Sequence, residues 1–343
     1  MRIELAPEET VIRKPPANLR DSDSRLFRHE MEKTFPAVHT KTYRKVTILP
    51  NGAIIKHLIL SELFFCKSIP QRGVVKVKSF AKLYINTITE IIRTSETVHI
   101  DKVLFLTNFY SDNFFHWMGD VLPKLEVLSS SGISLKDYTL VVPKTCDNVY
   151  TRYTLNRYNL PFVILESHQR VKAKNLVYTP ILAPTGNFRP QLMERIRSRF
   201  LNRIPPSGTK SDRVYISRKK AAKRRILNEH ELLPLLKNHH FRVVIMEDLT
   251  FEEQIKLMAN TDTLMSLHGA GLTHMLWMNE GSKVIEIRAD NDAKNNLFFS
   301  LASDLNLKYS YMFAKPSNTN ATTQKTDFLV NPESLDSLLQ SVL

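Results

Sequence analysis

Short apolar runs that look like strands alternate with helix-like stretches over most of the chain, and this alternation limits the fold more than any other feature. In the first half, the expected strands lie at 103–106, 139–142, 162–165 and 176–178, and the expected helices at 114–128, 148–158 and 191–201. Such alternation is typical of βα units around a mostly parallel sheet. It predicts the α/β class.

The second half repeats the alternation more regularly. Strands are expected at 213–217, 241–245, 263–267 and 283–287, and helices at 229–237, 251–259 and 272–278. Thr250 and Glu253 have the spacing of a capping box, and Phe251, Ile255 and Met258 share one apolar face. This half is expected to be Rossmann-like.

A break at 203–212, rich in turn-forming residues and lacking an apolar face, separates the halves. We therefore predict domains at 1–202 and 203–331, with a C-terminal helix at 332–343 that packs back on one of them. Residues 1–45 are polar without a sustained period and are expected to be irregular. Apolar runs at 46–49 and 54–60 flank Pro50-Asn51-Gly52, which predicts a hairpin and a β-rich edge.

Charge and cysteine content narrow the functional classes. The 343-residue chain carries a formal charge of +14, and residues 1–204 hold +13 of it. This asymmetry suggests that the first half meets an acidic polymer, a lipid phosphate, a membrane surface or nucleic acid, although dispersed solubilising lysines explain it equally well. Cys66 and Cys146 are too few for a disulfide framework, which favours a reducing compartment. No export signal is readable, so a cytoplasmic location is expected.

A glycine-rich segment after the strand at 263–267 is the most specific candidate site. It reads Ser266-Leu-His268-Gly269-Ala270-Gly271-Leu272-Thr273-His274 and opens the next helix. Small residues let backbone N–H groups approach a ligand closely, and a helix N-terminus favours an anion. This predicts a diphosphate site, with a plain strand–turn–helix junction as the alternative.

A basic run in the same half supports phosphate binding. Seven of the thirteen residues from 213 to 225 are basic and none is acidic. Arginine binds phosphate oxygens bidentately, so this run could hold a leaving nucleotide without a metal ion. The alternatives are a solvated loop, a nuclear-localisation signal or a nucleic-acid patch.

A third candidate lies in the first half, in the segment from Asn113 to Pro123. His116 and Asp120 are four residues apart and share one helix face, which makes them a candidate general base. The alternative is a structural pair that ties the helix to its neighbours, with Trp117 in the core. Of two Asp-x-Asp triplets, the one at 21–23 is expected to be a surface turn. The one at 290–292 is better placed for a metal ion but is not expected to hold one, because the arginines already supply positive charge.

Taken together, these segments resemble glycosyltransferase family 61. The matching motifs are N-F-F-H-W-x-x-D-x-L-P from 113, Y-I-S-R from 215, R-R-I-x-N-E from 224, H-G-A-G-L-T-H from 268 and K-V-I-E-I from 283. Their order and spacing agree with the family over roughly 105–290. The resemblance implies a GT-B enzyme with two Rossmann-like domains across a cleft, the acceptor bound mainly by the first and the nucleotide-sugar by the second.

The resemblance also assigns roles to individual residues. It implies donor binding by Arg218, Arg225, Asn228, Glu229, His268, Gly269, Ala270, Gly271, Thr273 and Glu286, an acceptor cleft at Asn113 and Trp117, and Asp120 or His116 as the base. Glu286 could bind the ribose hydroxyls or lie against the basic run. His274 departs from the family, whose members commonly have asparagine there.

The implied activity is inverting, metal-independent sugar transfer that needs no cofactor. The donor is a nucleotide-sugar, with UDP expected for the family, and the acceptor is a glycan or lipid-linked glycan that could be anionic. Surface or capsular polysaccharide synthesis is the expected setting, with peripheral membrane contact through the basic half. An anchored parent protein in the Golgi lumen is the alternative location. Two other functions compete with this one. The first is nucleic-acid binding, although the basic segments of this chain lack the interleaved aromatic residues that such binding favours. The second is sugar-phosphate transfer in capsule synthesis.

Overall fold

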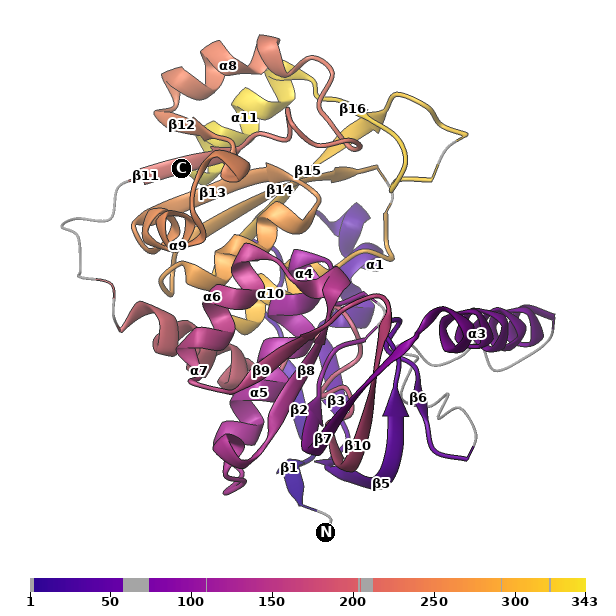
Figure 1. Cartoon of the computed structure of the whole chain (residues 1–343). Coiled ribbons are helices and arrows are strands. Elements are labelled where there is room, and N and C mark those ends of the chain that lie inside the picture. The colour runs from indigo at the N-terminus through magenta and orange to yellow at the C-terminus, as the bar shows by residue number, and fades with distance from the viewer. Residues whose placement is uncertain are drawn as a thin grey trace. The chain divides into compact units, whose positions relative to one another are not determined.

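The chain forms two compact units, which Figure 1 traces in order. The computed structural model describes residues 3–57, 74–108, 110–202, 204, 212–290, 292–320 and 322–343, with the backbone alone described from 74 to 83. The first unit comprises Met1–Glu9 and Phe35–Thr185, and the second comprises Thr10–Thr34 and Gly186–Leu343. The predicted linker at 203–212 lies almost wholly outside the described residues.

This division differs from the predicted boundaries, since residues 10–34 and 186–202 group with the second unit. Helix α7 (Pro190–Leu201) contacts the helix Ala270–Trp277, and its Phe200 ring lies 5.1 Å from that of Trp277. The C-terminal helix α11 (Pro332–Val342) contacts α8 (Glu229–Asn238) in the second unit. The buried Phe200–Trp277 contact therefore joins residues 186–202 to the second unit, although the turn-rich stretch at 203–212 had predicted a domain boundary between them.

The first unit is built on a six-stranded mixed sheet in the order β6-β5-β10-β7-β8-β9. Its strands are β5 (Lys41–Ile48), β6 (Ile54–Ile55), β7 (Glu96–Phe105), β8 (Thr139–Pro143), β9 (Phe162–Leu165) and β10 (Gln169–Tyr178). Strands β10, β7, β8 and β9 are parallel, whereas β5 and β6 form an antiparallel edge. The predicted hairpin around Asn51 is thus confirmed for the described residues, while 58–60 lie outside them.

The predicted irregular stretch 1–45 contains short strands instead. Besides the start of β5, these are β1 (Glu4–Ala6), β2 (Glu9–Ile12), β3 (Glu32–Phe35) and β4 (Val38–His39), which pair as the two-stranded ribbons β1-β4 and β2-β3. Strands of two to four residues are too short to show the alternation that marks a longer strand, so no local pattern indicated them.

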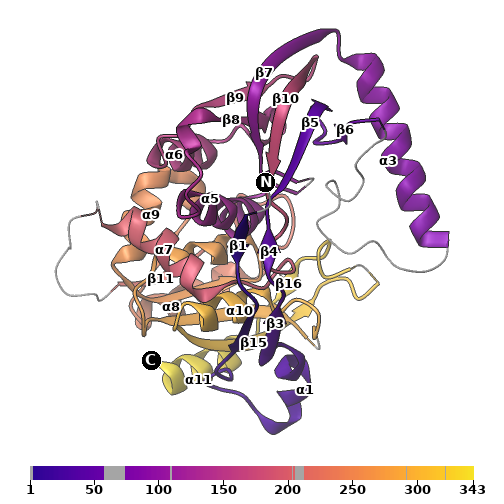
Figure 2. The ribbon, with the colours of Figure 1, turned by 90° about the horizontal axis from the view of Figure 1, so that it is seen from below.

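The helices of the first unit include one that was not expected. Among the described residues, its α-helices are α3 (Val74–Arg93), α4 (Phe114–His116), α5 (Leu122–Ser129) and α6 (Val149–Arg157), with a π-helical turn at Trp117–Val121 inside the predicted helix 114–128. Helix α3 was not among the expected elements, and it extends away from the strands of its unit in both views (Figures 1 and 2). No described helix is long and apolar enough to cross a membrane.

The second unit contains a six-stranded sheet in the order β12-β11-β13-β14-β15-β16, parallel except for β16. Its strands are β11 (Asp212–Ile216), β12 (Phe241–Val244), β13 (Thr261–Leu267), β14 (Lys283–Ala289), β15 (Lys308–Pro316) and β16 (Phe328–Leu329). Helices α8 and α11 cover one face, and α9 (Phe251–Ala259) and α10 (Leu297–Asp304) cover the other (Figure 1). The predicted Rossmann-like half is confirmed as a mostly parallel α/β unit, whereas the facing GT-B arrangement stays a prediction.

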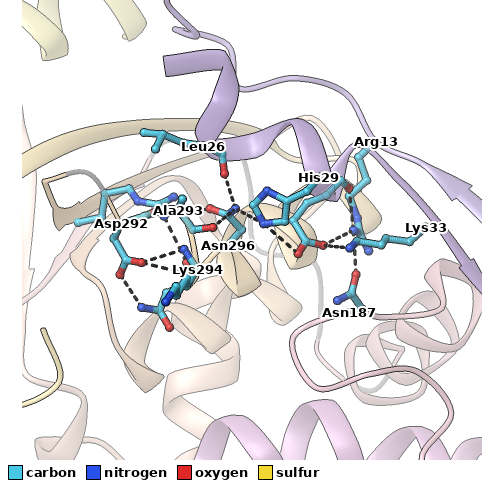
Figure 3. Close-up of polar contacts among 12 residues, drawn as sticks. Arg13, Leu26, His29, Lys33, Asn187, Asp292, Ala293, Lys294 and Asn296 are labelled. Carbon is cyan, nitrogen blue, oxygen red and sulfur yellow. Dashed lines mark hydrogen bonds and ion pairs between the residues drawn. The ribbon is translucent and has the colours of Figure 1, made fainter. Parts of the chain in front are cut away.

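The segment Thr10–Thr34 is anchored to the second unit through aromatic and polar contacts. Phe27 of α1 (Ser24–Phe27) is fully buried, and its ring packs against Phe299 and Tyr311 with centroids 5.1 and 4.9 Å apart. Asn296 donates a hydrogen bond to the carbonyl of Leu26 at 2.7 Å (Figure 3). The segment thus forms part of the core of the second unit.

Candidate functional site

The carboxyl ends of β11 and β13 meet where the strand order of the second sheet reverses. In the sheet, β11 lies between β12 and β13. The last residue of β11, Ile216, pairs with Ser266 near the end of β13. Open α/β sheets bind ligands at such a switch point. Arg218 follows β11 and His268 follows β13, so the structure brings these two predicted donor residues to the same edge.

Arg218 is held rigidly beside the glycine-rich segment. Its Nε donates to the carbonyl of Arg224 at 2.8 Å, and its Nη2 donates to that of Lys223 at 3.1 Å. The third guanidinium nitrogen lies over Gly269, where a Cβ atom would meet Arg218 Cζ at 3.0 Å and Nη1 more closely still. Gly269 has an extended backbone with φ 167°, so this position needs glycine for space and not for conformation.

The electrostatics of this edge favour an anion. Burial, together with the neighbouring Arg224 guanidinium, lowers the pKa of Arg218 to about 10, while Glu247 opposes the change. Burial also lowers the pKa of Arg224. Within the described residues, no carboxylate lies within 4 Å of either guanidinium. Two half-buried cations without a carboxylate partner suit a diphosphate.

His268 is oriented by a buried carboxylate. Its Nδ1 lies in hydrogen-bond contact with Glu286, whose other oxygen accepts a hydrogen bond from Tyr309. Burial alone would raise the pKa of the fully buried Glu286, but His268 and Arg288 hold it below its usual value. An ionised carboxylate can only accept, so Nδ1 carries the proton and Nε2 is left for a ligand.

Glu286 therefore contacts His268 and Tyr309, and its predicted role in donor binding stays a prediction. Both of its oxygens are engaged within the protein, and its side chain is fully buried. Of the two roles considered for this residue, contact with ribose hydroxyls is the less compatible with this geometry.

Glu229 contacts the residues of β11 and its carboxyl end that precede Arg218. Its carboxylate accepts hydrogen bonds from Tyr215 at 2.8 Å and from Ser217 at 3.0 Å. These bonds join the start of α8 to the end of β11. Glu229 thereby fixes the strand end from which Arg218 projects.

Arg225 and Asn228 hold the segment before α11. Arg225 pairs with Asp327 at 3.2 Å, and half of its side chain is exposed. Asn228 donates to the carbonyl of Val330 at 2.8 Å and accepts from its N–H at 3.1 Å. The structure places these two predicted donor residues in contact with residues 327–330, and their donor role stays a prediction.

The glycine-rich segment continues into a 3-10 helix, Ala270–Trp277. The first N–H groups of a helix lack intrahelical partners, so those at Ala270 and Gly271 are suited to a phosphate. A Cβ atom at Gly271 would lie 3.3 Å from Ile216. Thr273 is 1% exposed, and burial lowers the pKa of His274 to about 3, so these two side chains belong to the core.

In the first unit, His116 and Asp120 form the expected pair. His116 Nδ1 and Asp120 Oδ2 are 2.8 Å apart, across the π-helical turn, with side-chain exposures of 18% and 8%. The Tyr110 ring stacks on His116 with centroids 5.2 Å apart. π-Helical turns are frequent at functional sites. The geometry fits a histidine base that an acidic neighbour orients.

The other two predicted residues of this segment have structural contacts. Asn113 caps α4 by accepting a hydrogen bond from the Phe115 N–H at 2.9 Å. Trp117 is fully buried and donates to Thr154 at 2.9 Å. Trp117 therefore packs in the core of its unit, as the structural alternative expected.

Sequence reasoning missed Tyr309 and Tyr110, which contact Glu286 and His116. Tyr309 had a usable signal, because Tyr309, Tyr311 and Phe313 alternate along one strand face. Tyr110 had none, since its stacking depends on the course of the loop after β7.

Neither Asp-x-Asp triplet forms a metal site among the described residues, where no group of three or more His, Cys, Asp or Glu side chains converges. Asp23 accepts a hydrogen bond from Tyr311 at 2.7 Å, and Asp292 accepts one from the Lys294 N–H at 3.0 Å. Both aspartates thus hold local structure. Metal independence stays a prediction.

Comparison with known proteins shows which chains this one is similar to. Similar proteins include the EGF domain-specific O-linked N-acetylglucosamine transferases of Bos taurus (28% identical over 170 residues, 47% of this chain and 31% of the relative), Drosophila melanogaster (37% over 115 residues, 32% and 22%) and Gallus gallus (26% over 216 residues, 61% and 36%). The matches thus span about a third or less of the length of these relatives. The Glycosyltransferase 61 profile matches residues 114–285, which is half of the chain and includes Arg218, His268 and the His116–Asp120 pair. The chain therefore belongs to glycosyltransferase family 61.

Proposed function

We propose that this protein transfers a sugar from a nucleotide-sugar to an acceptor hydroxyl. The observation that carries the proposal is the assembly of Arg218, Gly269 and His268 at the strand switch point of the second unit. The relatives are named for O-linked transfer of N-acetylglucosamine, so UDP-N-acetylglucosamine is the first donor to test.

In this proposal, the second unit holds the leaving diphosphate. Arg218 and Arg224 supply positive charge, and the N–H groups of Ala270 and Gly271 supply hydrogen bonds. Donors fixed before the reaction stabilise the charge that develops on the leaving group without reorganising. His268 would add a hydrogen bond through Nε2, in the orientation that Glu286 imposes.

The first unit supplies the base. Asp120 accepts from Nδ1 of His116, which leaves Nε2 free to take the proton of the acceptor hydroxyl. Of the two candidate bases, His116 is therefore the one we propose, with Asp120 orienting it. A single in-line displacement then inverts the anomeric centre. We propose a GT-B enzyme that divides the work in this way, without a metal ion.

We further propose that α3 makes peripheral contact with an anionic membrane. Its side chains Tyr84, Ile85, Ile88 and Ile92 are 42%, 63%, 54% and 80% exposed, although apolar side chains normally cover a core. The helix also carries three lysines and one acid, a composition typical of helices that lie on anionic lipid. A function in capsular polysaccharide synthesis and a location in the cytoplasm stay predictions.

Co-sedimentation with vesicles tests this contact. We expect the protein to bind phosphatidylserine vesicles and not phosphatidylcholine vesicles, and Ile88→Glu with Ile92→Glu to abolish binding. Asn86→Glu, at an exposed polar position of the same helix, is the matched control. Equal binding by all three proteins would contradict the proposal.

Calorimetric titration with UDP and UDP-N-acetylglucosamine tests the donor site, with and without EDTA. We expect EDTA-insensitive binding that weakens about 10- to 100-fold in Arg218→Ala, since a hydrogen bond to a charged group contributes about 1.5–3 kcal/mol. Arg242→Ala, which removes an exposed arginine of β12, is the control. Absence of UDP binding by the wild type, together with steeply salt-dependent binding to DNA, would instead support the nucleic-acid alternative.

A further inference from the structure

A network of hydrogen bonds connects His268 of the candidate donor site to a buried arginine of β14. His268 Nδ1 contacts one oxygen of Glu286, and the hydroxyl of Tyr309 donates to the other. Arg288 Nη1 lies 3.4 Å from the same hydroxyl and donates to it. Glu286, Arg288 and Tyr309 are 0%, 1% and 3% exposed. Apart from His268, the network lies outside residues 114–285, which the family profile matches.

Arg288 sets the direction of the hydrogen bonds in this network. A guanidinium has only donors, so the Tyr309 oxygen accepts from Arg288 and its single hydrogen is directed to Glu286. An ionised carboxylate has only acceptors, so the second oxygen of Glu286 receives its hydrogen from Nδ1 of His268. Each group thus fixes the next. The result is a His268 ring with a hydrogen on Nδ1 and with Nε2 available to a ligand.

Arg288 also supplies the counter-charge that a buried carboxylate requires. Burial alone would raise the pKa of Glu286, but His268 and Arg288 hold it below its usual value. A neutral His268 contributes no charge, so Arg288 is then the cation that favours the ionised form of Glu286. Loss of this cation would let Glu286 take up a proton and donate to Nδ1. The hydrogen of a neutral His268 would then lie on Nε2.

Arg288 is itself held by residues that are distant in the sequence. Its Nη2 donates to Asn296 Oδ1 at 2.9 Å and to the carbonyl of Asp292. Its guanidinium carbon lies 5.1 Å from the centre of the Phe27 ring, within the range of a cation–π contact. Asn296 also donates to the carbonyl of Leu26 (Figure 3). The N-terminal segment that contains Phe27 therefore helps to fix the position of the guanidinium.

We propose that Arg288 and Tyr309 are positioning residues of the donor site. Acting through Glu286, they hold the ring hydrogen of His268 on Nδ1 and so present Nε2 to the donor. Neither residue meets the donor itself, because both are buried. The role in donor binding rests on the proposed transferase function, whereas the placement of the ring hydrogen does not. If the two residues served only the core, their loss would lower stability and leave the ring hydrogen in place.

¹⁵N NMR of histidine-labelled protein, without any ligand, tests the placement of this hydrogen. At about pH 8 an ordinary histidine is neutral, and the ¹⁵N shifts distinguish the two tautomers of its ring. The His268 signals are identified by their loss in His268→Asn. We expect the wild type to carry the hydrogen on Nδ1, and Arg288→Met and Tyr309→Phe to move at least part of it to Nε2. Tyr309→Phe keeps the ring in the core, so it decides the question if Arg288→Met fails to fold.

Tyr311→Phe is the matched control. Tyr311 lies on the same strand as Tyr309, and its hydroxyl donates to Asp23 at 2.7 Å. The control therefore also breaks a hydrogen bond between a tyrosine and a carboxylate, and it should leave the His268 signals as they are in the wild type. The inference is overturned if the control moves these signals as much as Tyr309→Phe does, or if no variant moves them.

A UDP titration of the same proteins connects the ring hydrogen to binding. We expect Tyr309→Phe to weaken UDP binding about 3- to 10-fold, the effect of one hydrogen bond, and to have no further effect in a His268→Asn background. Tyr311→Phe should leave UDP affinity unchanged. An equal loss in both backgrounds would overturn the positioning role. Failure of the wild type to bind UDP would reject the proposed donor site, while the NMR comparison would still decide where the ring hydrogen lies.

Discussion

At the scale of single residues, two histidines six positions apart have opposite surroundings. His268 lies against the ionised Glu286 and is partly exposed, whereas His274 is 4% exposed and has its pKa lowered to about 3 by burial. Both histidines lie in one short motif, so the sequence alone does not distinguish their roles. Glu286 of β14 orients His268 so that it can meet a ligand, whereas burial places His274 in the core.

The burial of His274 predicts a pH-dependent loss of stability. Below its ordinary pKa of 6.5, the unfolded chain binds a proton that the folded chain does not bind until about pH 3. The contribution to stability is therefore complete above pH 6.5, and it falls by up to about 1.4 kcal/mol per pH unit below it. We expect urea unfolding of His274→Asn to show a shallower fall between pH 6.5 and 4.

His230→Asn is the control for this experiment, because the side chain of His230 is 78% exposed. It should leave the pH dependence of the unfolding free energy as it is in the wild type. If His274→Asn retained the full wild-type slope, the buried neutral state of His274 would be rejected.

Asp120 gives a second prediction at this scale. Asp120→Asn removes the acceptor that fixes the tautomer of His116, so we expect turnover to fall about 10²- to 10⁴-fold while UDP affinity stays unchanged. Hydrolysis of UDP-N-acetylglucosamine, in which water replaces the acceptor, measures turnover without knowledge of the acceptor. The control is Asp137→Asn, which changes an exposed acid of the same unit and should leave the rate unaltered. A wild-type rate in Asp120→Asn would remove Asp120 from the mechanism.

At the scale of elements, the sequence predicted best where a local signal and tertiary packing agree. Helix α9 has the predicted bounds and capping box, because Thr250 and Glu253 bond each other's backbone N–H groups. Strand β9 also has its predicted bounds. By contrast, α10 is buried nearly all round and so lacks the one-sided apolar pattern that marks a surface helix.

The candidate site was predictable in part for the same reason. The positions of Arg218 and His268 at strand ends follow from alternation, and the switch-point geometry then brings them together. The bonds of Arg225 to Asp327 and of Asn228 to Val330 join residues about a hundred positions apart. No local pattern in one sequence can indicate such contacts, so their structural role emerged only from the fold.

The junction of β13 and its 3-10 helix carries the prediction at this scale. Gly269→Ala would push a methyl group into the Arg218 guanidinium, so we expect UDP affinity to fall about 10-fold or more, measured by calorimetry, with little change in stability. In an Arg218→Ala background the same substitution should have no further effect, because the clash is gone. If Gly269→Ala lowered UDP affinity as much in the Arg218→Ala background as in the wild type, the coupling between the two residues would be rejected.

Gly281→Ala is the matched control. Gly281 has φ +80°, and a Cβ atom added there would meet nothing within 4 Å among the described residues, so alanine is strained by its backbone alone. We expect about 1 kcal/mol of lost stability and unchanged UDP affinity. The two glycines thus separate a requirement for space from a requirement for conformation.

At the scale of the whole molecule, the chain enters the second unit twice, first with Thr10–Thr34 and again from Gly186. Arg13 fastens the first of these segments, since its Nε and Nη2 each donate to Asp304 at 2.9 Å and its Nη1 donates to Asn187 at 3.0 Å. The side chains of Arg13 and Asp304 are 0% and 1% exposed. The N-terminal segment is therefore part of the proposed donor-binding unit and not a separate arm.

This pairing predicts strong non-additivity between the two residues. Arg13→Ala or Asp304→Ala alone breaks this buried ion pair, which costs about 3–5 kcal/mol, whereas the double substitution removes both charges. We expect urea unfolding to give a double-mutant loss well below the sum of the single losses. Arg13→Ala should also expose residues 10–34 to limited proteolysis before the rest of the second unit. Additive losses, or cleavage of 10–34 no faster than in the wild type, would show that the segment is held without this ion pair.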